Sequence, residues 1–185
     1  MKPIRRQWMT CVAAAILLVS APATAQRSDS SEAAVKAAFL YNFTRFVEWP
    51  DAAFPQPSAA FVVCDFADAA FRKELGTILQ SEQVQGRQIT IAPASLEDPR
   101  GCHLAYFAQG EAVRQGRMLD AVRRLPVLTI GEGRRFLEQG GVIAFLLEND
   151  RVRFAISRRA ADAAGLSISS RLLRVAREFE GRTQP

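Results

Sequence analysis

The sequence predicts an α/β fold in a single domain: a mostly parallel sheet flanked by helices, followed by a C-terminal antiparallel hairpin and a terminal helix. Short apolar runs alternate with amphipathic stretches through the middle of the chain, which is typical of parallel strands joined by helices. Near the end, two apolar runs are separated by only two residues, which is typical of a hairpin. No internal repeat, low-complexity tract or linker interrupts the series, so we predict one domain over residues 26–185.

Residues 1–25 have the features of a cleaved signal peptide. A basic start is followed by an apolar run from about Met9 to Val19, and Ala23 and Ala25 are small residues at the positions that a signal peptidase inspects. The apolar run is about half the roughly 20 residues that a membrane-spanning helix needs. We therefore expect export and cleavage after Ala25.

The first element of the domain is predicted to be a helix over residues 31–49. Its apolar residues recur at three- and four-residue steps, and Asn42 lies in the middle of the apolar stripe. Asp29 and Glu32 are suited to cap its start, and Trp49-Pro50 to end it. Because a buried amide needs a partner, we expect Asn42 to bond a neighbouring loop backbone rather than a ligand.

The middle of the chain alternates strands and helices. Gly131-Glu132-Gly133 follows a strand and precedes a helix, where a phosphate loop would lie, but Phe136 replaces the third glycine and Glu132 would repel an anion, so we predict a turn. The predicted strands are 59–64, 88–92, 102–107 and 126–130, and the predicted helices are 68–80 and 111–125.

The C-terminal hairpin is predicted from residues 141–148 and 151–157, which flank the turn pair Asn149-Asp150. With a two-residue loop, Glu148 opposes Arg151. One face is then core, and the other mixes apolar and basic side chains. The core face holds Ile143, Phe145, Leu147, Val152, Phe154 and Ile156, and the mixed face holds Val142, Ala144, Leu146, Arg151, Arg153 and Ala155. A final helix is predicted after Ser167, with Ile168, Leu172, Val175, Ala176 and Phe179 on one side.

Two cysteines remain in the mature chain once Cys11 leaves with the signal peptide. Cys64 ends one predicted strand and Cys102 begins another, so a sheet could bring the two together. An even count in an oxidising compartment favours a Cys64–Cys102 disulfide. Two buried free thiols, or a Cys102/His103 metal fragment without a third ligand, are the alternatives.

The composition argues against catalysis and against nucleic-acid binding. The 24 basic and 19 acidic residues give a net charge of +5, which falls to +2 when the three basic residues of the signal leave, and the arginines are interleaved with acids. One histidine, His103, excludes paired-histidine metal sites, and no C-x-x-C or Walker A motif is present. We predict a binding protein that is no enzyme and uses no metal or cofactor. An enzyme would need His103, Asp65 or Ser169 to converge.

Residues 37–50, AAFLYNFTRFVEWP, resemble the opening signature of the YfiR family of periplasmic proteins. Later segments follow the order of the same family. They are GCH at 101–103, GGVIAF at 140–145, RVRF at 151–154 and GLSISSRLL at 165–173.

This resemblance implies a YfiR-like domain over 26–185 and a periplasmic protein that represses an inner-membrane diguanylate cyclase by binding its periplasmic sensor region. Repression would keep cyclic-di-GMP low and disfavour biofilm. The resemblance also implies release by an outer-membrane lipoprotein, redox control through cysteines that match Cys64 and Cys102, and a homodimer.

We expect the partner to bind the mixed face of the hairpin and the last helix. In the second hairpin strand, Ala155 and Ser157 stand where the family often has Glu and Asn, so the contact chemistry departs from the family pattern. The alternative is a small-molecule sensor that stacks an aromatic metabolite beside the first helix. The expected partner-binding residues are Ala144, Leu146, Arg151, Arg153, Ala155, Leu166 and Ile168.

Overall fold

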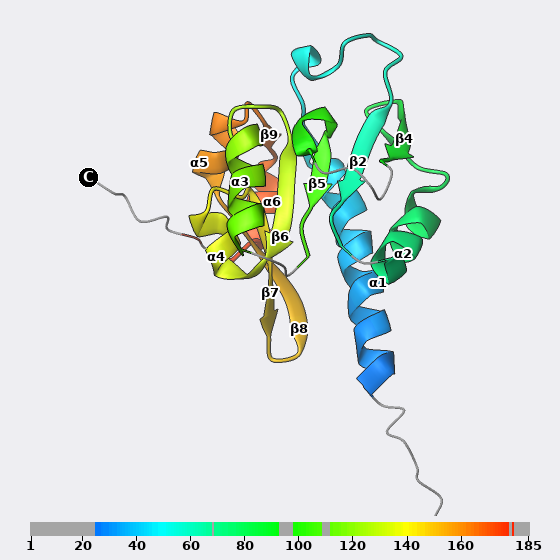
Figure 1. The fold of residues 1–185 in the computed structure, drawn as a ribbon, viewed down its shortest axis with the longest axis vertical. Coiled ribbons are helices and arrows are strands. Elements are labelled where there is room, and N and C mark those ends of the chain that lie inside the picture. The colour runs from blue at the N-terminus through cyan, green and yellow to red at the C-terminus, as the bar shows by residue number, and fades with distance from the viewer. Residues whose placement is uncertain (1–24, 68, 93–97, 109–111, 178, 180–185) are drawn as a thin grey trace, which may run out of the picture.

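A curled seven-stranded sheet flanked by helices forms the centre of the computed structural model (Figure 1). The structure describes residues 25–67, 69–92, 98–108, 112–177 and 179, so the predicted signal peptide lies outside it apart from Ala25. The strands of the main sheet are β2 (Phe61–Asp65), β3 (Gln83–Val84), β4 (Arg87–Ile91), β5 (Leu104–Tyr106), β6 (Leu128–Glu132), β7 (Ile143–Glu148) and β8 (Arg151–Ile156). A separate two-stranded sheet pairs β1 (Val47–Glu48) with β9 (Ser167–Ile168), and the helices are α1 (Ala25–Thr44), α2 (Ala69–Leu79), α3 (Ala112–Val122), α4 (Gly133–Glu138), α5 (Arg158–Ala163) and α6 (Ser170–Val175).

The strand order is β3-β4-β2-β5-β6-β7-β8. The five central strands pair in parallel, and only the edge strands β3 and β8 are antiparallel. The helices α2, α3 and α4 each lie in the chain between two parallel strands. The mostly parallel α/β fold predicted from the sequence is therefore confirmed.

Two hydrophobic clusters form the core. The larger one includes Leu40 and Phe43 of α1, and Phe43 packs against Phe145 and Phe154 of the hairpin. The second contains the two cysteines together with residues of α3, α4 and the hairpin. Because side chains alternate along a strand, β7 contributes Phe145 to one cluster and its neighbours to the other.

The predicted bounds of the first helix are wrong at both ends. The helix begins at Ala25, so the predicted capping residues Asp29 and Glu32 lie inside it, and it ends at Thr44. The segment after it turns and continues as β1, in register with β9. The apolar spacing of the sequence runs on through Trp49, so periodicity could not reveal that this backbone pairs with a segment near the other end of the chain.

The predicted burial of Asn42 is also wrong. Asn42 is exposed, whereas Thr44 is 5% exposed and its hydroxyl donates to the carbonyl oxygen of Tyr41 at 2.7 Å. The buried side of α1 carries Ala37, Leu40 and Phe43. A nearly continuous apolar sequence left the phase of the helix ambiguous, and packing decided it.

The last helix is shorter than predicted. It begins at Ser170, after Ile168 has paired in β9, and Ser169 caps it by accepting a hydrogen bond from the backbone N–H of Arg171. Leu172 is buried as expected, but Val175 is 69% exposed. The predicted apolar side therefore covers only part of the helix.

Candidate partner-binding site

The hairpin of β7 and β8 projects past the rest of the sheet, on the same side of the molecule as the N-terminal half of α1 (Figure 1). Phe145 pairs with Phe154 and Glu148 with Arg151, as predicted, and the turn residues Asn149 and Asp150 have φ of 50° and 56°. These angles belong to the type I′ turn, whose twist matches that of the flanking strands. The predicted register is confirmed.

Four of the expected partner-binding residues are buried. The prediction of Ala144, Ala155 and Leu166 as surface contacts is wrong, whereas Leu146 still lines the groove described below. Ala144 and Ala155 are 0% exposed, Leu146 is 9% and Leu166 is 3%. The first three belong to the second hydrophobic cluster, together with Phe136 and Leu137 of α4. Among the expected residues, Arg151 and Arg153 are exposed and Ile168 is half-buried.

Phe136 makes this second core possible. Its side chain is 0% exposed, and it lies so close to two glycines that a Cβ on Gly131 or Gly141 would approach its ring to 2.3 or 2.1 Å. The glycines therefore make room for the aromatic ring, and Gly133, with φ of 74°, starts α4 from the strand end. The glycines that resemble a phosphate loop serve packing and a turn. The spacing of Gly131 and Gly141 around Phe136 is the sequence signal that could have indicated a covered face.

An open groove of about 660 Å³ lies between α1 and the tip of the hairpin. Its base is at the carboxyl ends of β5 and β6, where parallel α/β sheets commonly place their binding sites. We call it the hairpin groove. It is lined by Glu32, Lys36, Ala108, Glu132, Gly133, Arg134, Phe145, Leu146, Leu147 and Glu148.

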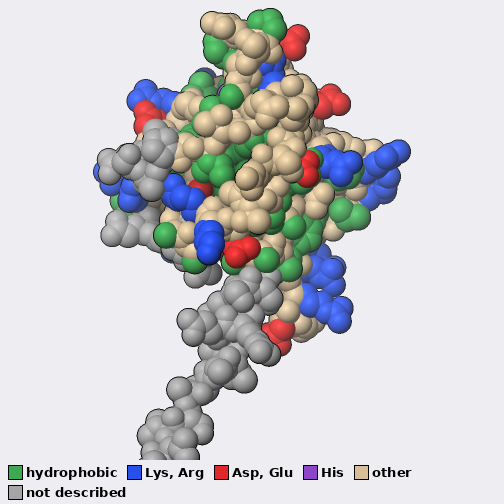
Figure 2. All heavy atoms as spheres, turned by 90° about the vertical axis from the view of Figure 1, so that its right-hand side faces the viewer, with side chains coloured by type: hydrophobic (Ala, Val, Ile, Leu, Met, Phe, Trp, Pro, Cys, Tyr) green, Lys and Arg blue, Asp and Glu red, His purple; other side chains and the backbone are tan. Residues whose placement is uncertain are grey.

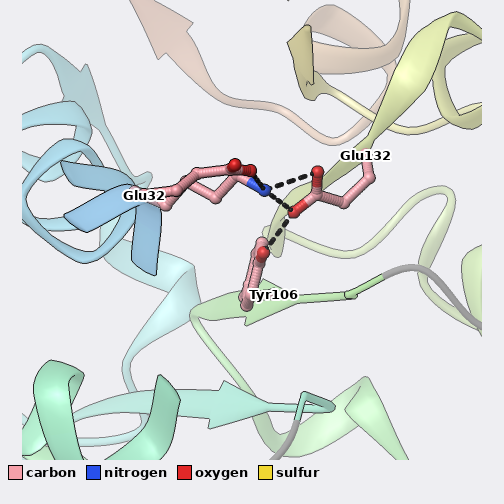
Figure 3. Close-up of polar contacts among 4 residues, drawn as sticks. Glu32, Tyr106 and Glu132 are labelled. Atoms are coloured by element: carbon pink, nitrogen blue, oxygen red, sulfur yellow. Dashed lines mark hydrogen bonds and ion pairs between the residues drawn. The ribbon is translucent and has the colours of Figure 1, made fainter. Parts of the chain in front are cut away.

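A polar network joins α1 to the sheet at the base of the hairpin groove (Figure 3). The Lys36 ammonium donates to both Glu132 carboxylate oxygens at 2.7 and 2.8 Å and pairs with Glu32 at 2.6 Å. The Tyr106 hydroxyl donates to Glu132 at 2.5 Å. The side chains of Lys36 and Glu132 are only 13% and 12% exposed, so these charge-assisted bonds are partly shielded from water.

The network affects the pKa values of two of its members. Burial lowers the pKa of Lys36, but hydrogen bonds to Glu132 and then Glu32 outweigh it, so that the pKa of Lys36 lies above its ordinary value. Burial, together with the negative charge of Glu132, raises the pKa of the Tyr106 hydroxyl. Both groups remain protonated donors at neutral pH, and the network is a fixed brace.

Comparison with known proteins decides the family. A family model described as YfiR/HmsC-like matches residues 33–177, which is most of the chain. The chain belongs to the YfiR/HmsC-like family. No protein of curated function matches the sequence. A crystal structure titled as a conserved domain protein from Vibrio cholerae O1 biovar El Tor strain N16961 is 13% identical, with a TM-score of 0.45 over 62% of this chain.

The YfiR/HmsC-like family is a family of periplasmic regulators of diguanylate cyclase signalling. The chain spans 53% of the Vibrio cholerae structure, about half its length. None of the helices in the described parts of the chain is both long and apolar enough to cross a bilayer.

Cys64 and Cys102 of this YfiR-like chain form a disulfide. Cys64 and Cys102 have Cα atoms 5.8 Å apart and are almost fully buried. The bond joins β2 to the residue two before β5, and β2 and β5 are neighbouring strands. It therefore ties together segments that are 38 residues apart in the sequence.

His103, next to the disulfide, has a structural role. Its Nδ1 accepts a hydrogen bond from the backbone N–H of Val62 at 3.0 Å, so its Nε2 carries the proton and donates to the carbonyl oxygen of Ala53 at 3.1 Å. The ring stacks on Phe54, and the indole of Trp49 donates to the His103 carbonyl oxygen. Burial lowers the pKa of His103 and favours the neutral ring that these contacts require.

The other chemistry-bearing candidates also have local partners. The Asp65 carboxylate accepts from the backbone N–H of Ala67 at 2.8 Å and lies 3.6 Å from the Arg72 guanidinium. Ser169 is a helix cap. Within the described ranges, no three histidine, cysteine, aspartate or glutamate side chains are arranged to hold a metal ion.

The aromatic side chains of the first predicted helix fill the core. Phe43 packs edge-on against Phe154, and Trp49 packs edge-on against Phe61. The groove beside α1 is instead lined by the charged residues Glu32 and Lys36 of that helix. On the face shown in Figure 2, basic and acidic side chains are scattered around the rim of the molecule and gather in no single patch.

Proposed function

We propose that this protein is a periplasmic adaptor that represses an inner-membrane diguanylate cyclase by binding the periplasmic sensor region of that enzyme. The observation that carries the proposal is the match of the YfiR/HmsC-like family model to residues 33–177, which include nearly all of the folded domain. The domain is then a docking module, and its effect on cyclic-di-GMP is indirect.

The architecture supports a protein that works by contact. The disulfide joins two neighbouring segments of the sheet, and the Lys36 network joins α1 to the sheet. The hairpin projects from this braced sheet (Figure 1). Rigid elements limit the entropy that is lost when two surfaces associate. Arg151 and Arg153 are exposed on the projecting hairpin, and we propose that they contribute to the partner surface together with the half-buried Ile168.

The family resemblance also suggests how repression would end. We propose that an outer-membrane lipoprotein withdraws the adaptor from the cyclase, that the Cys64–Cys102 bond makes the adaptor sensitive to redox state, and that it acts as a homodimer. Withdrawal by the lipoprotein, redox sensitivity and dimerisation are three separate proposals.

Deleting the gene tests the proposed function. Cyclic-di-GMP, measured by mass spectrometry in cell extracts, should rise in the deletion strain and return to the original level when the full-length gene is restored. A matched gene without codons 2–25 should not restore it, because its product is not exported. An unchanged cyclic-di-GMP level in the deletion strain would exclude the proposed function, and full restoration by the truncated gene would exclude action in the periplasm.

A further inference from the structure

We propose that the hairpin groove receives an extended apolar segment of a partner protein that carries a basic side chain, and that this segment adds as a strand to the free edge of β7. The identity of the partner as the exported region of a diguanylate cyclase rests on the proposed function. The groove and the chemistry of its occupant are argued independently, from the backbone edge, the exposed apolar side chains and the charges.

The backbone edge is left open because β6 ends too early. Its last residue, Glu132, pairs with Phe145, so that residues 146–148 of β7 have no neighbour on the β6 side among the described strands. These residues remain paired with β8 on their other side. The tip of the hairpin is therefore a two-stranded ribbon with one edge facing the groove.

The hydrogen-bond pattern shows which peptide groups face the groove. The backbone N–H of Arg177 donates to the carbonyl oxygen of Phe154, on the side of β8 away from β7. In an antiparallel pair, facing and outward-pointing residues alternate, so Phe154 and its partner Phe145 both point outward. Two residues further along β7, the N–H and C=O of Leu147 also point to the groove. Unpaired strand edges of this kind bind extended peptides through their main chains.

Apolar side chains continue from the core to the mouth of the groove. Phe39 of α1 packs against Phe145 and Phe154, with ring centroids 6.0 and 5.7 Å apart. Val35 lies one helical turn before Phe39 and is 43% exposed, and Leu147 lies two residues beyond Phe145 on the same strand face and is 63% exposed. Exposed large apolar side chains are few among the described residues. Val35 and Leu147 continue the contact of Phe39 with Phe145 outward, toward solvent.

The charges of the groove select the occupant. Three carboxylates (Glu32, Glu132 and Glu148) line it, against the two cationic residues Lys36 and Arg134, and Glu148 is already paired with Arg177 at 3.0 Å. The ammonium of Lys36 is already shared between two of the carboxylates. At the base of the groove, two carboxylates therefore share one ammonium, so an occupant with a lysine or arginine is favoured there and an acidic segment is disfavoured.

The same charges argue against a second copy of this chain as the occupant. A two-fold contact would place the groove of one copy on the groove of the other. The carboxylates of the two grooves would then face each other, and juxtaposed like charges oppose association. A different protein with an apolar, basic segment meets no such repulsion.

Photo-crosslinking in cells tests the proposal. The full-length protein carries benzoylphenylalanine in place of Leu147, and a matched control carries it in place of Val113, which is 75% exposed on α3. We expect an adduct from position 147 only, and mass spectrometry should map it to an extended segment of the cyclase with apolar residues and a lysine or arginine. No adduct at position 147, equal capture at both positions, or an adduct of two copies of this chain would overturn the proposal.

Two substitutions give an independent readout. Leu147→Asp should abolish repression, so that cyclic-di-GMP rises to the level of the deletion strain, whereas Val113→Asp should leave it unchanged. Because the side chains of Leu147 and Val113 are mostly exposed, neither substitution should lower the melting temperature. Glu32→Arg is a separate test of the charge at the groove, and it should also weaken repression. If Leu147→Asp and Glu32→Arg both repress normally, the groove is not the docking site. If position 147 captures an extended segment of a membrane protein that is not a diguanylate cyclase, the hairpin groove is still a docking site but the proposed function is wrong.

Discussion

His103 illustrates how a chemically versatile residue is used for structure alone. The sequence drew attention to it because it is the only histidine in the chain. In the folded protein, both ring nitrogens are engaged by backbone groups, of Val62 on one side and Ala53 on the other. The contact with Val62 requires an unprotonated Nδ1. Protonation of the ring would therefore turn an acceptor into a second donor that faces an N–H group.

This arrangement predicts that stability falls in mild acid. Burial holds the pKa of His103 below the value of 6.5 that applies in the unfolded chain, so the unfolded state binds the proton more readily. The contribution of His103 to stability should be fully present above pH 6.5 and should be lost as the pH falls toward and through the lower pKa of the folded state. Melting temperatures between pH 8 and pH 5 measure it. His103→Asn keeps an acceptor but does not titrate, so its melting temperature should depend less on pH; an equal dependence would contradict this role.

At the scale of elements, α1 is held to the sheet by packing along one side and by the Lys36 network near its middle. The two kinds of contact act at different places. Phe43 is fully buried among the aromatic residues of the hairpin, whereas Lys36 and Glu132 lie at the edge of the groove. The network fixes the distance between α1 and β6, and this distance sets the width of the groove.

Lys36→Met should therefore destabilise the protein and loosen α1. Removing the ammonium leaves the shielded Glu132 carboxylate with the Tyr106 hydroxyl but without its charged donor, and the loss should be about 1.5–3 kcal/mol. Urea unfolding followed by circular dichroism measures this loss. Arg100→Met is the control, because it removes an ion pair with Asp98 that is exposed, and it should leave the unfolding midpoint unchanged. Equal midpoint shifts in the two variants would show that the network adds nothing beyond a surface pair.

At the scale of the whole molecule, distant segments of the chain are joined at two places. The disulfide links β2 to Cys102, two residues before β5. The strand β1 pairs with β9, so that the opening motif of the family contacts its closing motif. Both motifs are therefore needed to complete the fold, and this explains why long, specific stretches of sequence occur at sites without reactive groups. The groove lies elsewhere, between α1 and the hairpin.

The disulfide should contribute substantially to stability. Closing a loop of 38 residues restricts the unfolded chain by about 4 kcal/mol in the chain-entropy model. The double variant Cys64→Ser/Cys102→Ser should lose close to this amount in urea unfolding. The native protein isolated from the periplasm should not react with a thiol-alkylating reagent in denaturant until a reductant is added. Labelling of both cysteines without reductant would mean that the bond is absent from the working protein.

Local features of the sequence determined the order of the main strands and helices, the turn at Asn149-Asp150 and the hairpin register. These features are a two-residue or a three- to four-residue apolar period and a turn pair, and all of them act over a few residues. The pairing of Cys64 with Cys102 was also accessible, because parity and compartment restrict the choice. The short strands β1, β3 and β9 were not predicted, since two residues carry no periodic pattern.

Only the tertiary structure decided which faces are buried. The sequence placed Ala144 and Ala155 on a mixed face, and α4 then covered that face because Phe136 fits between two glycines. The hairpin groove depends equally on where β6 stops relative to β7 and on the contact of Lys36 with Glu132, which are 96 residues apart in the sequence. Burial and site geometry arise from what packs against a residue, and local periodicity contains no information about which distant segment that will be.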